Sequence, residues 1–140
     1  MITITLCGSG RHREAIHSTG KSLQDRGVVV LVPPLHQIDK LVEGRSGECR
    51  ELAWKGATFA HMNRIIKADV VYVVNPDGYL GSSTTLELGY AVALGKLVVA
   101  MQPDEAETAR NVLFDIILGL SDTDAACDEL LDRLTTSRRR

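Results

Sequence analysis

The sequence from Ala68 to Met101 reads ADVVYVVNPDGYLGSSTTLELGYAVALGKLVVAM, and its order of apolar and turn residues decides the fold. The run Val70–Val74 is short, β-branched and apolar, which is typical of a strand buried on both faces. Asn75-Pro76-Asp77-Gly78 predicts a turn, and Gly81-Ser82-Ser83-Thr84 leads into an amphipathic helix. A second apolar run, Leu97–Met101, predicts another buried strand. A strand, a loop, a helix and a strand in this order predict a unit of parallel sheet.

The rest of the chain repeats this alternation. Further strands are predicted at residues 2–6, 28–32 and 116–118, and helices at about 13–26, within 35–47, at 48–67, 105–114 and from 121 to about 135. In the helix over 48–67, the apolar positions include Leu52 and Phe59. We therefore expect a single α/β domain over residues 1–140, a flavodoxin/Rossmann-like three-layer sandwich. Its five-stranded parallel sheet should have the order 2-1-3-4-5.

Composition excludes several classes of protein. The formal net charge is −2, so there is no basic field to bind a nucleic acid polymer, and Arg138-Arg139-Arg140 is interpreted as a solvated tail. No apolar run approaches the roughly 18 residues that span a bilayer, so we expect no membrane partner. The three cysteines are far apart without CxxC spacing, and no cluster has metal-ligand spacing. We expect a cytoplasmic protein without a secretory signal.

The predicted strand order places two unusual loops next to each other. In such a sheet the ligand binds beyond the carboxyl ends of strands 1 and 3, where the strand order switches. Strand 1 ends at Gly8-Ser9-Gly10, followed by Arg11, His12 and Arg13 at the start of a helix. Backbone amides, a hydroxyl and a helix N-terminus suit the phosphate of a nucleotide. The alternative is that the glycines only provide the turn between strand and helix.

The segment DGYLGSSTTLELGYAVALGK, residues 77–96, resembles the signature of the nucleoside 2-deoxyribosyltransferase-like superfamily. The strand and loop from Ile2 to Gly10 resemble the N-terminus of that family. The superfamily includes deoxyribosyltransferases and nucleoside 5'-monophosphate N-glycosidases, and its nucleophile is the glutamate of the ELG sequence. The resemblance therefore implies an enzyme in which Glu87 has that role. The family needs no cofactor or metal, and its members are usually homodimers or larger, so a homodimer or homotetramer is expected, with Trp54 as an intersubunit anchor.

Cleavage of an N-glycosidic bond gives the sugar oxocarbenium character, which a carboxylate stabilises or attacks. The resemblance assigns this role to Glu87 and suggests that Asp77, in the loop with Gly78, binds sugar hydroxyls or assists proton transfer. Tyr79 is expected to stack on the base. Structural alternatives exist for these residues. Glu87 and Thr84 also fit a helix capping box, and Asp77 also fits an Asp-Gly turn.

Two serines of the same loop, Ser82 and Ser83, are expected to donate to a 5'-phosphate, as similar hydroxyls do in the monophosphate glycosidases. They also fit helix N-caps.

Two positions depart from the family pattern. His61 stands where many relatives carry an acid, and Gly81 stands where transferase-type relatives carry a carboxylate. A histidine can act as a general acid near neutral pH, so His61 is a candidate catalytic residue.

These departures argue against transferase activity in particular, and they are also the evidence for a module that binds a nucleotide without chemistry. The leading hypothesis is hydrolysis of the N-glycosidic bond of a nucleoside or nucleoside 5'-monophosphate. A nucleoside 2-deoxyribosyltransferase and a non-catalytic nucleotide-binding module are the alternatives. A lysine-decarboxylase-like phosphoribohydrolase is a third, although its PGGxGTxxE motif matches only loosely.

Overall fold

Five parallel strands form the sheet at the centre of the molecule, in the order β2-β1-β3-β4-β5. The computed structural model describes residues 1–137, without the side chains of residues 35–37; the arginines at 138–140 lie outside the described residues. The predicted α/β class and strand order are confirmed. The strands are β1 (Thr3–Cys7), β2 (Val29–Leu31), β3 (Val70–Val73), β4 (Leu97–Ala100) and β5 (Ile116–Ile117).

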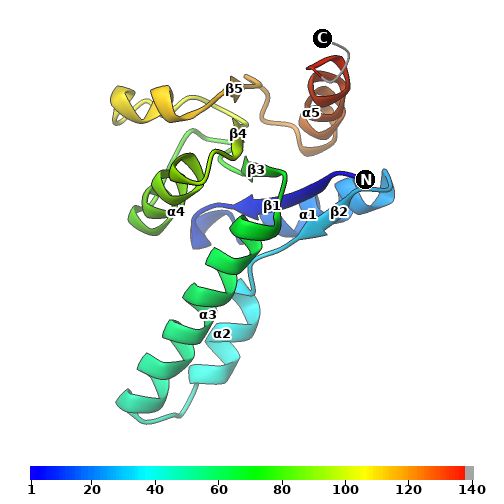
Figure 1. The fold of residues 1–140 in the computed structure, drawn as a ribbon. Helices are drawn as coiled ribbons and strands as arrows, with labels where there is room; N and C mark the ends of the chain where they lie inside the picture. The colour runs from blue at the N-terminus through cyan, green and yellow to red at the C-terminus, as the bar shows by residue number, and fades with distance from the viewer. Residues whose placement is uncertain (138–140) are drawn as a thin grey trace.

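Helices cover both faces of the sheet (Figure 1). On one face lie α1 (Arg13–Asp25) and α5 (Thr123–Ser137), and on the other α3 (Gly47–Lys67), α4 (Ser82–Ala93) and the 3-10 helix η2 (Thr108–Leu113). A short 3-10 helix η1 (Gly10–His12) precedes α1, and α2 (Leu35–Val42) precedes α3. No helix among residues 1–137 is long and apolar enough to cross a bilayer.

The sheet has a separate apolar core on each face because alternate strand residues point in opposite directions. Val70 and Tyr72 of β3 pack in the core beneath α1 and α5, whereas Val71 and Val73 pack in the core beneath α3 and α4. All four residues are buried, as expected for a strand covered on both sides.

Helix α3 extends beyond the sheet, with α2 alongside it (Figure 1). Its buried residues are His61 and Ile65, near its C-terminus. The predicted apolar positions Leu52 and Phe59 are 63% and 57% exposed, so they do not face the core. The reason is geometric: Leu52 lies in the first turns of α3, which extend beyond the sheet (Figure 1), and Phe59 lies on the side of the helix opposite to the buried His61.

The predicted helix over residues 105–114 is wrong in its first part. Only Thr108–Leu113 are helical, and they form a 3-10 helix. The carboxylate of Asp104 accepts hydrogen bonds from the amides of Ala106 (3.0 Å) and Glu107 (3.3 Å), which makes a turn there instead. Arg110 forms an ion pair with the same buried carboxylate.

Gly78, in the loop after β3, has a conformation that other residues rarely adopt. Its φ is +81°, and a Cβ built on it would lie 2.7 Å from the carbonyl oxygen of Pro103. We expect Gly78→Ala to lower the free energy of unfolding by about 2–4 kcal/mol, from backbone strain and overlap together. Urea denaturation followed by circular dichroism would measure it.

The matched control is Gly56→Ala on the exposed part of α3, where a Cβ meets nothing within 4 Å. It should raise the same free energy by up to about 1 kcal/mol, because glycine weakens a helix interior. Equal changes in the free energy of unfolding for the two variants would contradict the conclusion that the conformation and surroundings of Gly78 exclude a side chain.

Candidate active site

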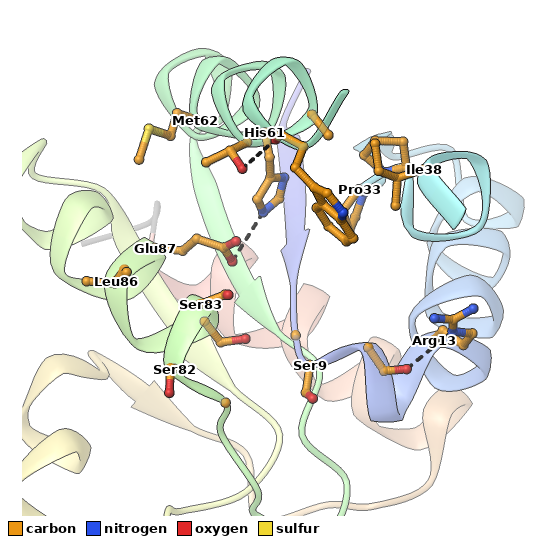
Figure 2. Close-up of a pocket in the computed structure, with 18 of the residues that line it drawn as sticks. Ser9, Arg13, Pro33, Ile38, His61, Met62, Ser82, Ser83, Leu86 and Glu87 are labelled. Carbon is orange, nitrogen blue, oxygen red and sulfur yellow. Dashed lines mark hydrogen bonds and ion pairs between the residues drawn. The ribbon is translucent and has the colours of Figure 1, made fainter. Parts of the chain in front are cut away.

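A cavity of about 460 Å³ opens at the carboxyl edge of the sheet, next to the end of β1. Its walls come from the loop after β1, the segment that leads into and forms α2, the middle of α3, and the first turns of α4 (Figure 2). The residues with polar side chains that line it are Ser9, Arg13, Asp39, Trp54, Thr58, His61, Ser82, Ser83, Thr84 and Glu87.

The loops after β1 and β3 meet beside this cavity, as the strand order predicts. Val74 donates its backbone N–H to the carbonyl of Cys7 at 2.8 Å, which continues the pairing of β1 with β3. Beyond that point the Nε2 atom of the buried His12 lies 2.8 Å from Oδ1 of Asp77. The cavity therefore lies at the point where the strand order switches.

Glu87 lies in the second turn of α4 and is not part of a capping box. The helix begins at Ser82 with Gly81 as its N-cap, whereas a capping box would need Thr84 at the N-cap position. The Glu87 side chain is 21% exposed and lines the cavity, where one carboxylate oxygen lies 3.3 Å from Nε2 of His61. Figure 2 shows the two side chains pointing toward each other. The local capping explanation for this glutamate is therefore wrong.

Cys7 joins these two residues, although the sequence indicates only a small core residue at the end of a strand. Its Sγ atom is buried and lies 3.4 Å from Nε2 of His61. Burial, together with the charge of Glu87 and a hydrogen bond to it, raises the pKa of the Cys7 thiol well above its usual value. The thiol is therefore neutral at pH 7.

The start of α4, the helix that carries Glu87, presents hydroxyls and backbone amides to the cavity. Ser82 and Ser83 occupy the first two positions of α4, and both are exposed at the cavity wall (Figure 2). Because Gly81 is the N-cap, the N-cap explanation for these serines is wrong. In α4 the first helical hydrogen bond runs from the amide of Thr85 to the carbonyl of Gly81, so the preceding amides stay available.

The loop after β1 contributes Gly8, Ser9 and Gly10 to the same cavity. Ser9 also accepts a hydrogen bond from the amide of Arg11 at 3.3 Å as the N-cap of η1, so it has a structural role as well.

Arg13, at the end of the run for which phosphate contact is predicted, also lines this cavity. Its guanidinium forms an ion pair with Asp39 of α2 at 2.9 Å and donates to the carbonyl of Gly10 at 3.3 Å. Among the described residues that line the cavity, it is the one arginine or lysine. The available signal was its place as the last residue of an Arg-His-Arg run after the glycine loop.

Four of the predicted site residues lie in a second cavity of about 290 Å³, namely Arg11, Asp77, Gly78 and Tyr79. The guanidinium of Arg11 lies 3.6 Å above the ring of Tyr79, so one face of that ring is already covered. The predicted roles of Asp77 in catalysis and of Tyr79 in base stacking stay predictions, and they concern a different cavity from the one that Glu87 lines.

Comparison with known proteins agrees with this layout. The family model described as nucleoside 2-deoxyribosyltransferase matches residues 6–129. The chain belongs to the nucleoside 2-deoxyribosyltransferase family. It is therefore a nucleoside 2-deoxyribosyltransferase-like enzyme, as the signature at residues 77–96 indicates.

Two solved structures are similar to this family member. A 2-deoxyribosyltransferase from the psychrotolerant bacterium Bacillus psychrosaccharolyticus is 27% identical, covers 70% of each chain and superposes with a TM-score of 0.53. A conserved protein from Enterococcus faecalis V583 is 16% identical, covers 95% of this chain and 99% of its own, and has a TM-score of 0.49. A comparison with curated proteins gives no match.

Asp77 should contribute to stability in a pH-dependent way. The amide of Tyr79, which donates to its carboxylate at 3.0 Å, and the nearby His12 lower the pKa of Asp77 from its usual 3.8. Because the pKa of Asp77 is lower in the folded state, its ionised carboxylate stabilises the fold above the unfolded-state pKa. This contribution is lost as the pH falls through the folded-state pKa. Because the side chain is half exposed, we expect Asp77→Asn to cost about 0.2–1 kcal/mol at pH 6.

Urea denaturation at pH 6 and at pH 3 would measure the difference, which should shrink at pH 3. Asp132→Asn on the exposed side of α5 is the control, with no such change. A cost for Asp77→Asn that stays the same at both pH values would contradict the role given to the charge.

Proposed function

We propose that the protein hydrolyses the N-glycosidic bond of a nucleoside or nucleoside 5'-monophosphate. The observation that carries the proposal is the Glu87 carboxylate, which lines the cavity 3.3 Å from His61 rather than bonding to its own helix. A carboxylate in that place suits a reaction in which the sugar carbon becomes positively charged. Family membership supports a nucleoside as the substrate.

The reaction would take place in two steps. As the bond between C1' and the base nitrogen breaks, its electron pair goes to the base, and protonated His61 donates a proton there. Glu87 stabilises the resulting oxocarbenium ion or forms a bond to C1'. A water molecule then attacks C1' and gives its proton to His61, which releases the free sugar and restores both side chains. The net change is the addition of one water across the bond.

The start of α4 supports a 5'-phosphate on the substrate. Available amides and the hydroxyls of Ser82 and Ser83 lie at a helix N-terminus, which favours anions. The guanidinium of Arg13 lines the same cavity and would exchange part of its pairing with Asp39 for the phosphate. Glu87 is five residues after Ser82, so one helix presents both the phosphate contacts and the carboxylate.

Gly81 supports hydrolysis over transfer. It occupies the position where transferase-type relatives carry a carboxylate. A Cβ built there would lie 3.6 Å from Oγ of Ser9 and 3.9 Å from the ring of Tyr79, which are ordinary contacts. Space for a side chain therefore exists, and the missing carboxylate is not forced by packing. In a transfer reaction the acceptor is a second nucleobase, and it would lack the contact with that carboxylate. In hydrolysis the acceptor is water, which does not need this contact.

Glu87→Gln should reduce the release of free base by about 10²–10⁴-fold, because the neutral amide neither attacks C1' nor compensates its charge. The assay incubates the protein with a panel of nucleosides and 5'-monophosphates, with and without a second base, and separates the products by chromatography. Glu14→Gln, on the exposed side of α1, is the matched control and should keep the activity.

Three results would count against the proposal. Unchanged release by Glu87→Gln removes the role of the carboxylate. Binding of nucleotides without any release by the unaltered protein favours the non-catalytic module. Base exchange that is faster than hydrolysis favours the transferase.

We also propose that two copies of the chain associate through the exposed apolar side chains of α3 and α4, which we call the α3–α4 surface: Leu52, Trp54, Phe59 and Leu86. Trp54 is 49% and Leu86 73% exposed, and both also line the cavity. Trp54 and Leu86 line the same cavity, and Leu52 and Phe59, seven positions apart, share one face of α3. Exposed apolar side chains of this kind are typical of an interaction site. A second copy there would complete the outer wall of the cavity, in agreement with the homodimer that the family resemblance implies.

Phe59→Glu should convert the assembly to the single chain, because a buried charge at the interface is costly. Size-exclusion chromatography with light scattering measures the mass, and Val112→Glu is the control, since Val112 is 83% exposed on η2. A single-chain mass for the unaltered protein, or an unchanged mass for Phe59→Glu, would rule out this surface.

A further inference from the structure

Three side chains with metal-binding atoms meet at the inner end of the cavity. Sγ of Cys7, Nε2 of His61 and a carboxylate oxygen of Glu87 all lie within 4.8 Å of one another. They come from β1, α3 and α4, and the first two are buried while Glu87 is partly exposed. Among the described residues this is the one group of three or more histidine, cysteine or acidic side chains so arranged.

Two of the three distances in this cluster match the edges of a tetrahedral metal site, and the third, from Cys7 to Glu87, lies within 4.8 Å. With zinc bonds of about 2.3 Å to sulfur and about 2.05 Å to nitrogen and oxygen, the sulfur–nitrogen edge is about 3.6 Å and the nitrogen–oxygen edge about 3.4 Å. The corresponding distances here are 3.4 Å from Cys7 to His61 and 3.3 Å from His61 to Glu87.

Nε2 of His61 has two close neighbours in this cluster, Cys7 and Glu87. Nε2 of His61 faces two neighbours at once, but it has a single hydrogen or a single lone pair in the ring plane, so it can serve only one of them well. A cation between the three atoms would use the lone pair of Nε2 and contact the other two donors at the same time.

The charges of the three groups also suit a divalent cation. A thiolate, a carboxylate and a neutral imidazole carry two negative charges in total, so a divalent ion would make the group neutral in a largely buried place. Binding would release the proton of the Cys7 thiol to solvent. Sulfur and imidazole ligands select zinc-like ions over magnesium or calcium.

We propose that Cys7, His61 and Glu87 bind one Zn²⁺ ion, and that the fourth coordination position faces the cavity. Three protein ligands and one open position are a common zinc arrangement. The ion is coordinated by the Glu87 carboxylate and by Nε2 of His61, the two groups that the proposed hydrolysis uses. Zinc binding and that reaction therefore exclude each other. The zinc site thereby makes the enzyme sensitive to the free zinc concentration.

Co²⁺ is the probe because its complexes with thiolates absorb strongly in the near ultraviolet. The full-length protein, reduced and freed of metal, is titrated with Co²⁺ and then with Zn²⁺. We expect thiolate-to-cobalt absorption that saturates at one equivalent and disappears when one equivalent of Zn²⁺ is added. Cobalt that binds without this absorption, or that does not bind at all, overturns the proposal.

Variants identify the ligands. Cys7→Ser should abolish the absorption and weaken Co²⁺ binding by about 100-fold. Mutation of a residue that only supports a metal ligand already lowers metal affinity by about 10- to 100-fold, and Cys7 is proposed as a ligand itself. His61→Asn should weaken binding similarly and serves as the second test if Cys7→Ser fails to fold by circular dichroism. Cys49→Ser and Cys127→Ser are the controls, because these cysteines lie outside the cluster, and they should keep the absorption. Absorption that persists in Cys7→Ser, or that is lost in Cys49→Ser, overturns the assignment.

The optical titration does not depend on any enzymatic activity. Cobalt absorption in a protein that releases no base would leave the metal site standing and remove the hydrolase. Base release by a protein that shows no cobalt absorption would do the reverse.

Discussion

The amide of Val74 donates to the carbonyl of Cys7 at 2.8 Å, and this bond continues the pairing of β1 with β3. Because neighbouring residues of a strand point to opposite faces, that register decides which side chain stands at the inner end of the cavity. In this register Cys7 packs on the side of α3 and α4, while Leu6 packs on the side of α1 and α5. A shift of one residue would put an apolar side chain or a glycine beside His61.

The close approach of the loops after β1 and β3, beside the cavity, depends on a glycine at position 8. Gly8 has no room for a side chain, since a Cβ would lie 2.9 Å from both Ile16 and the carbonyl of Val74. The loop after β1 therefore lies close against the loop after β3. Polar groups gathered next to an apolar core carry a desolvation cost, and such exceptions to the packing rules are typical of functional sites.

Most of the fold could be predicted from the sequence, because its signals are local. β-branched runs ended by glycine or proline define the strands, and the alternation with helices fixes the parallel order. The meeting of the loops after β1 and β3 follows from that order alone. The exposed part of α3 could not be predicted, because its apolar side chains have the helical spacing of a core face and only the three-dimensional arrangement shows that they do not face the core.

The site was predictable only in part, for two different reasons. Whether Glu87 caps its helix depends on whether the helix begins at Ser82 or at Thr84, and sequence patterns do not define helix ends that finely. Cys7 and His61 are 54 positions apart and come from different elements, so no spacing in the sequence links them. The lowered pKa of Asp77 likewise depends on a backbone amide whose direction only the folded loop defines.

The projecting pair α2 and α3 has a consequence for any ligand of the cavity. One wall belongs to this pair, which rests on the sheet mainly through the last turns of α3 (Figure 1). Because this wall is held mainly at its sheet end, a small tilt of the pair there would change the width of the cavity opening farther out. A ligand that fixed such a tilt would lose the entropy of that motion on binding, so a molecule that already held the outer end of the pair would make binding tighter without touching the ligand.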